Sequence, residues 1–214
     1  MTGVQTCALP ISIQSVAQSL ESGLVGTASV PELQSGAAAS ILEDMRHGLG
    51  IIRSRTEALG RFMAAYARLA RLPQPALAPV NVTEWITRVA KLEARAKVRL
   101  EKGPPLVISA DRDQLEQLLI NLVHNAADAA HETGGGVTLT WSRYSSYLEV
   151  FVLDEGPGIS NTANLFVPFF TTKPGGSGIG LVLSRQIAEA HGGSLTLENR
   201  RDGRGCEAKL RLPI

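Results

Sequence analysis

Aromatic residues, cysteine and net charge are all scarce in this chain of 214 residues. Aromatics make up 5% of it while leucine and alanine are plentiful, which favours helices packed on a sheet. The formal net charge of +1 gives no electrostatic case for binding nucleic acid or an anionic membrane. Cys7 and Cys206 are too few for a disulfide framework, and no apolar run approaches the roughly 20 residues that cross a bilayer. We therefore expect a soluble, cytoplasmic protein.

The first residues need separate treatment. Met1–Ile11 resembles the translation of a sequencing-adaptor string with GTG taken as the start codon, and every codon of the segment matches. We interpret residues 1–11 as an artefact, so Cys7 has no expected role. The native protein is then expected to continue upstream, where its signal-sensing part and any membrane anchor would lie.

Residues 12–75 show helical periodicity. Ile13, Val16 and Leu20 recur at helical spacing, and a longer series alternates three and four apart, the a/d seam of a bundle or coiled coil. That series is Leu42, Met45, Leu49, Ile52, Thr56, Leu59, Met63, Tyr66 and Ala70. We expect a helical hairpin that forms a homodimeric four-helix bundle. Packing of the seam against the rest of the same chain is the alternative.

From about residue 78 the pattern changes to α+β, and residues 78–214 are expected to form a two-layer α/β sandwich. Strands are predicted at 98–101, 106–109, 137–141, 147–153, 194–198 and 208–212. Asp111 is expected to cap a helix that runs to about Ala130, with Gln114 completing a capping box. A further helix is predicted over 179–191, after a loop at 155–177 that is rich in glycine, proline and threonine.

The helix after Asp111 carries polar residues on the face opposite its apolar stripe. They are Gln117, Asn121, His124, Asn125 and Asp128. Alone, such a face is equally well explained as a solvated surface. Because Mg²⁺ prefers oxygen ligands and keeps several waters, one or two of these side chains plus nucleotide phosphates would suffice to hold it.

Two further segments suit a nucleotide. Asp154 follows the apolar run 150–153, and its carboxylate could accept a hydrogen bond from the exocyclic amine of adenine. Gly156 and Gly158 would let the backbone approach the base, although an ordinary turn would use the same residues. Gly176, Gly178 and Gly180 precede a helix, whose N-terminal N–H groups can face a polyphosphate.

In this order, Asn121–Asn125, Asp154–Gly158, Phe166–Lys173 and Gly176–Gly180 resemble the N, G1, F and G2 boxes of one ATPase superfamily. That superfamily includes sensor histidine kinases, gyrase, Hsp90 and MutL. The resemblance implies a Bergerat-type fold, ATP and Mg²⁺ as cofactors, Asn125 as the metal ligand and Asn121 as a possible second one. The nucleotide-binding residues that it implies are Asn121, His124, Asn125, Asp154, Gly156, Gly158, Ile159, Phe170, Thr172, Lys173, Gly176, Gly178, Gly180 and Leu181. Phe169 or Phe170 would anchor the lid, and Lys173 would meet the phosphates.

The short lid and the helical hairpin are most similar to nitrogen-regulation-type sensor kinases. The resemblance implies an ATP-dependent protein-histidine kinase that passes its phosphoryl group to the receiver domain of a response regulator. An anti-sigma serine kinase of the same superfamily and a dimerisation module with a vestigial pocket are the alternatives. The hairpin disfavours the first. The second is disfavoured by the intact Asn125, Asp154, Gly158 and Gly178.

A phospho-accepting histidine within His-Glu-x-x-Asn is missing from the sequence. His47 is followed by Gly-Leu and has no adjacent acid, His124 belongs to the predicted site, and His131 and His191 end helices. By the resemblance, the acceptor would fall near position 4. We therefore expect that truncation removed it, and that this chain binds ATP and dimerises but does not phosphorylate itself.

Overall fold

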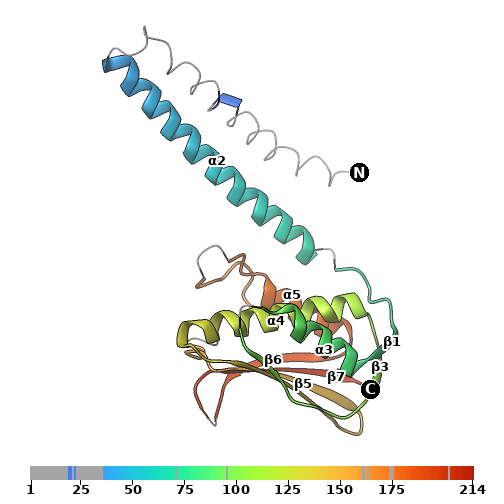
Figure 1. Cartoon of the computed structure of the whole chain (residues 1–214). Coiled ribbons are helices and arrows are strands. Elements are labelled where there is room, and N and C mark those ends of the chain that lie inside the picture. Colours follow the sequence, from blue (N-terminus) through green and yellow to red (C-terminus); the bar gives the residue numbers. More distant parts are fainter. Residues whose placement is uncertain are drawn as a thin grey trace. The chain divides into compact units, whose positions relative to one another are not determined.

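The computed structural model describes residues 19, 20, 22, 36–70, 72–94, 96–160, 162, 164–173, 176–201 and 203–214. The chain divides into two compact units, residues 1–70 and 71–214. Each unit is described by itself below, and Figure 1 gives the labels of the helices and strands.

The first unit contains the long helix α2, Gly36–Ala70. Met45, Ile52, Leu59 and Tyr66 occupy one heptad position of the predicted seam, and each is about half exposed (52%, 46%, 49% and 51%). An apolar stripe therefore runs along α2. The helix predicted near residues 13–24 lies outside the described residues except for 19, 20 and 22. Within the described part of the chain, no helix is both long and apolar enough to cross a membrane.

The second unit is built on a mixed five-stranded sheet with the strand order β2-β4-β5-β7-β6. Its strands are β2 (Val98–Leu100), β4 (Val137–Arg143), β5 (Tyr147–Asp154), β6 (Ser194–Asn199) and β7 (Cys206–Pro213). β2 pairs with β4 in parallel and the other pairs are antiparallel. β1 (Ala78–Asn81) and β3 (Val107–Ala110) form a separate two-stranded sheet.

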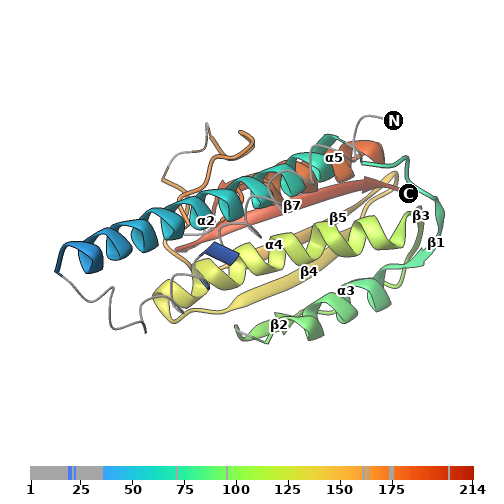
Figure 2. The same ribbon diagram turned by 90° about the horizontal axis from the view of Figure 1, so that it is seen from above.

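Three helices of the second unit cover one face of the five-stranded sheet (Figures 1 and 2). They are α3 (Val82–Leu92), α4 (Arg112–Thr133) and α5 (Gly180–Ala190). β4 and β7 alternate as half-buried strands do, and the buried positions of β4 are Val137, Leu139 and Trp141. The core side of α4 consists of Leu115, Leu118, Leu119 and Leu122, all nearly inaccessible. The predicted α+β sandwich is confirmed.

The start of α4 differs from its prediction in one contact. Asp111 caps the helix as expected, since its Oδ1 accepts the Gln114 N–H at 3.1 Å. The Gln114 side chain does not complete the capping box, because its Nε2 donates to the Pro73 carbonyl at 3.0 Å. The Asp111 N–H donates instead to His191 Nε2 at 3.0 Å. His191, 80 positions away in sequence, thus accepts the Asp111 N–H that the Gln114 side chain would accept in a capping box.

Candidate functional site

A cavity of about 560 Å³ lies beside α4, the 154–160 loop and the start of α5. Residues 164–173 and 176–178, called the lid below, contribute part of its lining. The cavity brings together all the predicted site residues except Gly156. Those lining it are Asn121, His124, Asn125, Asp154, Gly158, Ile159, Phe170, Thr172, Lys173, Gly176, Gly178, Gly180 and Leu181. Segments far apart in sequence therefore meet around one space that suits a small molecule.

Asp154 is the last residue of β5 and is almost fully buried, with 5% of its surface exposed. Its Oδ1 accepts the Gly156 N–H at 2.8 Å and the Cys206 N–H at 3.1 Å. Burial raises the pKa of the carboxyl above its ordinary value, although these two hydrogen bonds act in the opposite direction. No described residue donates to Oδ2, so the oriented carboxylate keeps acceptor capacity.

The loop after Asp154 is held at its far end by Asn199, a residue to which the sequence patterns gave no role. Asn199 Oδ1 accepts the Ile159 N–H at 2.6 Å, and its Nδ2 donates to the Ile159 carbonyl at 3.0 Å. Gly158 adopts φ 83°, a left-handed conformation that favours glycine. Gly156 lies outside the cavity lining and packs on α4, where a Cβ would lie 2.7 Å from Ala129 Cβ.

Two residues with positive φ face each other at the base of the lid. Phe169 has φ 67°, which is rare for a bulky side chain, and its N–H donates to the Gly178 carbonyl at 3.0 Å. Gly178 has φ 65°, and a Cβ there would lie 2.5 Å from the Phe169 carbonyl carbon. Phe170 lines the cavity and is 47% exposed, while the Phe166 ring packs under the Arg185 guanidinium at 4.7 Å. The lid is thus attached through Phe169 and Phe166.

The polar face of α4 supplies the opposite wall. Lys173 reaches from the lid to this helix, with Nζ 2.8 Å from Asp128 Oδ2 and 3.3 Å from Asn125 Oδ1. His124 Nε2 lies 3.5 Å from an oxygen of Glu93, whose side chain is 1% exposed. Gln117, on the same helix face, is exposed and does not line the cavity.

The donor set at the cavity suits a hard cation only in company with a ligand. Within the described part of the chain, no group of three or more His, Cys, Asp or Glu side chains could hold a metal. The Asn125 amide oxygen is an oxygen donor of the type that Mg²⁺ takes together with phosphates and water. Metal binding here would therefore depend on a phosphate-bearing molecule.

His191 is placed to stabilise the fold and does not line the cavity. It forms the C-cap of α5, as predicted, and its backbone N–H donates to the Ile187 and Ala188 carbonyls. Its ring bridges two helices: Nδ1 lies 2.8 Å from the Ile187 carbonyl oxygen, and Nε2 accepts the Asp111 N–H. The His191 ring therefore connects the end of α5 to the start of α4.

A glycine-flanked cavity between a helix and a lid, over a mixed sheet, defines a nucleotide-binding α/β sandwich. The family model described as "Histidine kinase-, DNA gyrase B-, and HSP90-like ATPase" matches residues 110–214. The solved catalytic domain of histidine kinase ThkA is 32% identical, with a TM-score of 0.57, and the match covers 64% of this chain and 95% of that domain. The chain belongs to this ATPase family, in its histidine kinase branch.

Curated relatives point to the same branch. The C4-dicarboxylate transport sensor protein DctS of Rhodobacter capsulatus is 36% identical over 152 residues, which are 65% of this chain and 23% of DctS. The nitrogen regulation protein NtrY of Azorhizobium caulinodans is 27% identical over 166 residues, which are 72% of this chain and 22% of NtrY. The chain thus spans about a quarter of the length of these relatives. ThkA has also been solved in complex with response regulator protein TrrA; that likeness, at 24% identity and a TM-score of 0.62, concerns the fold.

Proposed function

We propose that this chain supplies the ATP-binding catalytic part of a sensor protein-histidine kinase in a two-component phosphorelay. The observation that carries the proposal is the meeting of Asn125, Asp154 and Gly178 around one cavity from three separate segments. Residues 78–214 are the proposed catalytic domain, and residues 12–75 the proposed remnant of the dimerisation hairpin. The proposed location is the cytoplasm.

Each wall of the cavity has a proposed role. Asp154 accepts a hydrogen bond from the adenine amine, since Oδ1 is already held by backbone donors and Oδ2 is not. Gly178, Gly180 and the N-terminus of α5 face the phosphates with backbone N–H groups. Asn125 binds Mg²⁺, with Asn121 as a possible second ligand and His124 near the phosphates. Bound magnesium would neutralise charge on the phosphate oxygens, so the chain's own work is to position them.

The partners follow from two features. The half-exposed stripe of Met45, Ile52, Leu59 and Tyr66 on α2 would be buried by a second copy of the chain in a four-helix bundle. ThkA was solved with a response regulator, and we propose a receiver domain of that class as the phosphoryl acceptor downstream of this kinase.

Calorimetric titration of ATP, with and without magnesium, tests the pocket. The unmodified chain should bind ATP in the micromolar range, more tightly with magnesium. Asp154→Asn and Asn125→Ala should each weaken binding at least tenfold. Gln117→Ala, on the same helix but outside the cavity, should leave it unchanged. Absence of binding by the unmodified chain, or equal losses in all three variants, would refute the proposal.

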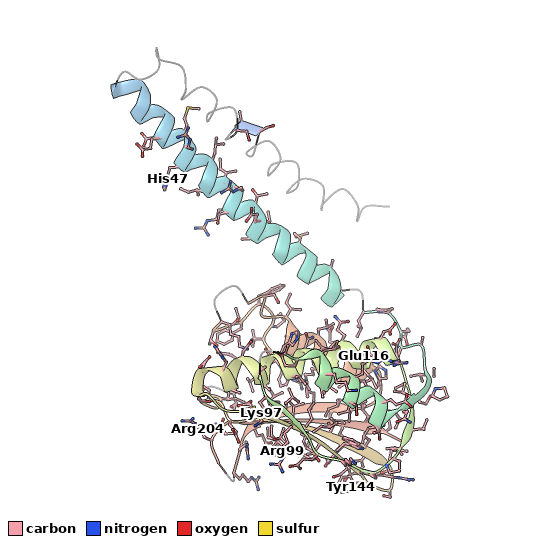
Figure 3. All side chains as sticks on the ribbon, in the orientation of Figure 1. His47, Lys97, Arg99, Glu116, Tyr144 and Arg204 are labelled. Carbon is pink, nitrogen blue, oxygen red and sulfur yellow. The ribbon has the colours of Figure 1, made fainter. Side chains whose placement is uncertain are left out.

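Phosphoryl transfer needs a separate test. With γ-labelled ATP, a separate acceptor hairpin from a related kinase should become phosphorylated in trans. His47, exposed on α2 (Figure 3), should not be labelled. Binding without transfer would favour the vestigial pocket, whereas stable label on His47 would overturn the expectation that the acceptor lies elsewhere.

A further inference from the structure

Asn199, the last residue of β6, uses both ends of its side-chain amide on one backbone unit. The amide accepts the Ile159 N–H and donates to the Ile159 carbonyl, at 2.6 and 3.0 Å. A neighbouring β-strand residue offers a backbone the same pair of groups. The Asn199 side chain therefore replaces a strand partner for a loop residue that lies 40 positions away in sequence.

The same hairpin, β6 and β7 with their connection, also holds the other end of this loop. Cys206, which pairs with Asn199 in the sheet register, donates its N–H to Asp154 Oδ1. Arg200 Nη1 lies 3.4 Å from the Asp154 carbonyl oxygen. The 154–159 loop is thus attached at Asp154 and at Ile159 to the same β-hairpin.

Between these two attachments, the loop touches Asn199 closely. A Cβ on Gly158 would lie 2.8 Å from Asn199 Oδ1, so the glycine lets the amide reach its neighbour. Asp154, Gly158 and Ile159 all line the cavity, whereas Asn199 does not. Asn199 reaches the cavity lining through the two side-chain hydrogen bonds to Ile159.

We infer that Asn199 is a positioning residue for the base end of the nucleotide pocket. Its two hydrogen bonds to Ile159, called the clamp below, hold the loop that recognises adenine in its binding conformation. This inference rests on the proposed function, because it takes the part of the cavity that the 154–159 loop lines as the binding site of the adenine base. Loss of the clamp would free Ile159 and Gly158 while leaving the Lys173 side of the cavity intact. Recognition of the base, and not of the phosphates, would then suffer.

Asn199→Ala tests the clamp, with Thr196→Ala as the matched control because Thr196 is an exposed residue of the same strand that does not line the cavity. We expect Asn199→Ala to raise the Kd for ATP and for ADP by the same factor, roughly tenfold for two lost hydrogen bonds. Its preference for ATP over GTP should shrink, whereas Thr196→Ala should keep all three affinities. General destabilisation of the fold would not lower the ATP-to-GTP preference.

Hydrogen exchange measured without nucleotide gives a second readout. The Ile159 amide should exchange roughly tenfold faster in Asn199→Ala than in Thr196→Ala. An unchanged ATP-to-GTP preference or an unchanged Ile159 exchange rate would overturn the inference. If the unmodified chain bound no ATP, the proposed function and the role in adenine recognition would both fail. Faster exchange of the Ile159 amide in Asn199→Ala would then show only that Asn199 holds the loop.

Discussion

Lys173 of the lid is paired with Asp128 of α4, with Nζ 2.8 Å from Oδ2, and it also contacts Asn125 Oδ1 at 3.3 Å. A carboxylate and a nucleotide phosphate would compete for the same ammonium group. Both side chains are more than a third exposed (38% and 39%), so the pair contributes little to folding. The pair matters for nucleotide binding, because Lys173 must break its contact with Asp128 when it binds a phosphate in the cavity.

Asp128→Asn should therefore tighten ATP binding. In this variant Lys173 can bind a phosphate without first breaking an ion pair with a carboxylate. We expect the Kd to fall by up to about fivefold, which corresponds to the roughly 1 kcal/mol that an exposed ion pair contributes at most. Calorimetry checks the change, and Glu132→Gln is the control because it alters the same charge at an exposed position of α4 outside the cavity. Weaker binding would show instead that Asp128 orients Lys173 for the phosphates.

Gly178→Ala should weaken nucleotide binding. The added Cβ would meet the Phe169 backbone at 2.5 Å, and alanine at φ 65° costs about 1–2 kcal/mol in addition. We expect at least a roughly fivefold rise in the Kd for ATP. Gly203→Ala is the control, because a Cβ there meets nothing within 4 Å. Equal effects of the two substitutions would contradict the contact with Phe169.

Local patterns predicted much of this molecule because the forces behind them act over a few residues. Alternation predicted β4 and β5, and the Asp111 cap fell where the spacing placed it. All of the nucleotide-binding residues that the family resemblance implies, except Gly156, also line the cavity. These features depend on neighbours in the chain, which the sequence displays directly.

The rest depends on partners that are distant in sequence. Asn199 stands at a strand end where any polar residue would fit, and only the fold brings Ile159 beside it. Gln114 has the right spacing for a capping box, yet the Pro73 carbonyl takes its amide. Asp128 belongs to a polar helix face that a solvated surface would also explain, and only the fold brings Lys173 against it. No pattern within one segment reports such contacts.

His191→Ala should destabilise the second unit. The substitution removes the acceptor of the partly buried Asp111 N–H and the link to the Ile187 carbonyl. We expect the free energy of unfolding to fall by about 1–3 kcal/mol. Both tryptophans, Trp85 and Trp141, are buried in this unit, so their fluorescence during denaturation follows it alone. His131→Ala, at an exposed position near the end of α4, should change stability by no more than about 0.5 kcal/mol.

The buried carboxyl of Asp154 should make stability fall with rising pH. Burial raises its folded-state pKa above the ordinary value of 3.8. Between 3.8 and the raised value, the folded chain keeps a proton that the unfolded chain has released, so the slope of unfolding free energy against pH is negative. The stability of the unmodified chain relative to Asp154→Asn should therefore decrease through this window and become level above it. Tryptophan fluorescence during denaturation at a series of pH values measures this difference.

The carboxyl of Asp111 should affect the pH dependence of stability in the opposite direction. Desolvation acts to raise the pKa of its carboxyl, but hydrogen bonds from the backbone of Ala76, Gln114 and Asp113 outweigh it and lower the pKa below 3.8. Its contribution is present above 3.8 and is lost as the pH falls through the lowered folded-state value. The stability of the unmodified chain relative to Asp111→Asn should thus increase with pH in that lower window. The same slope for both variants would mean that desolvation does not outweigh the backbone hydrogen bonds at Asp154.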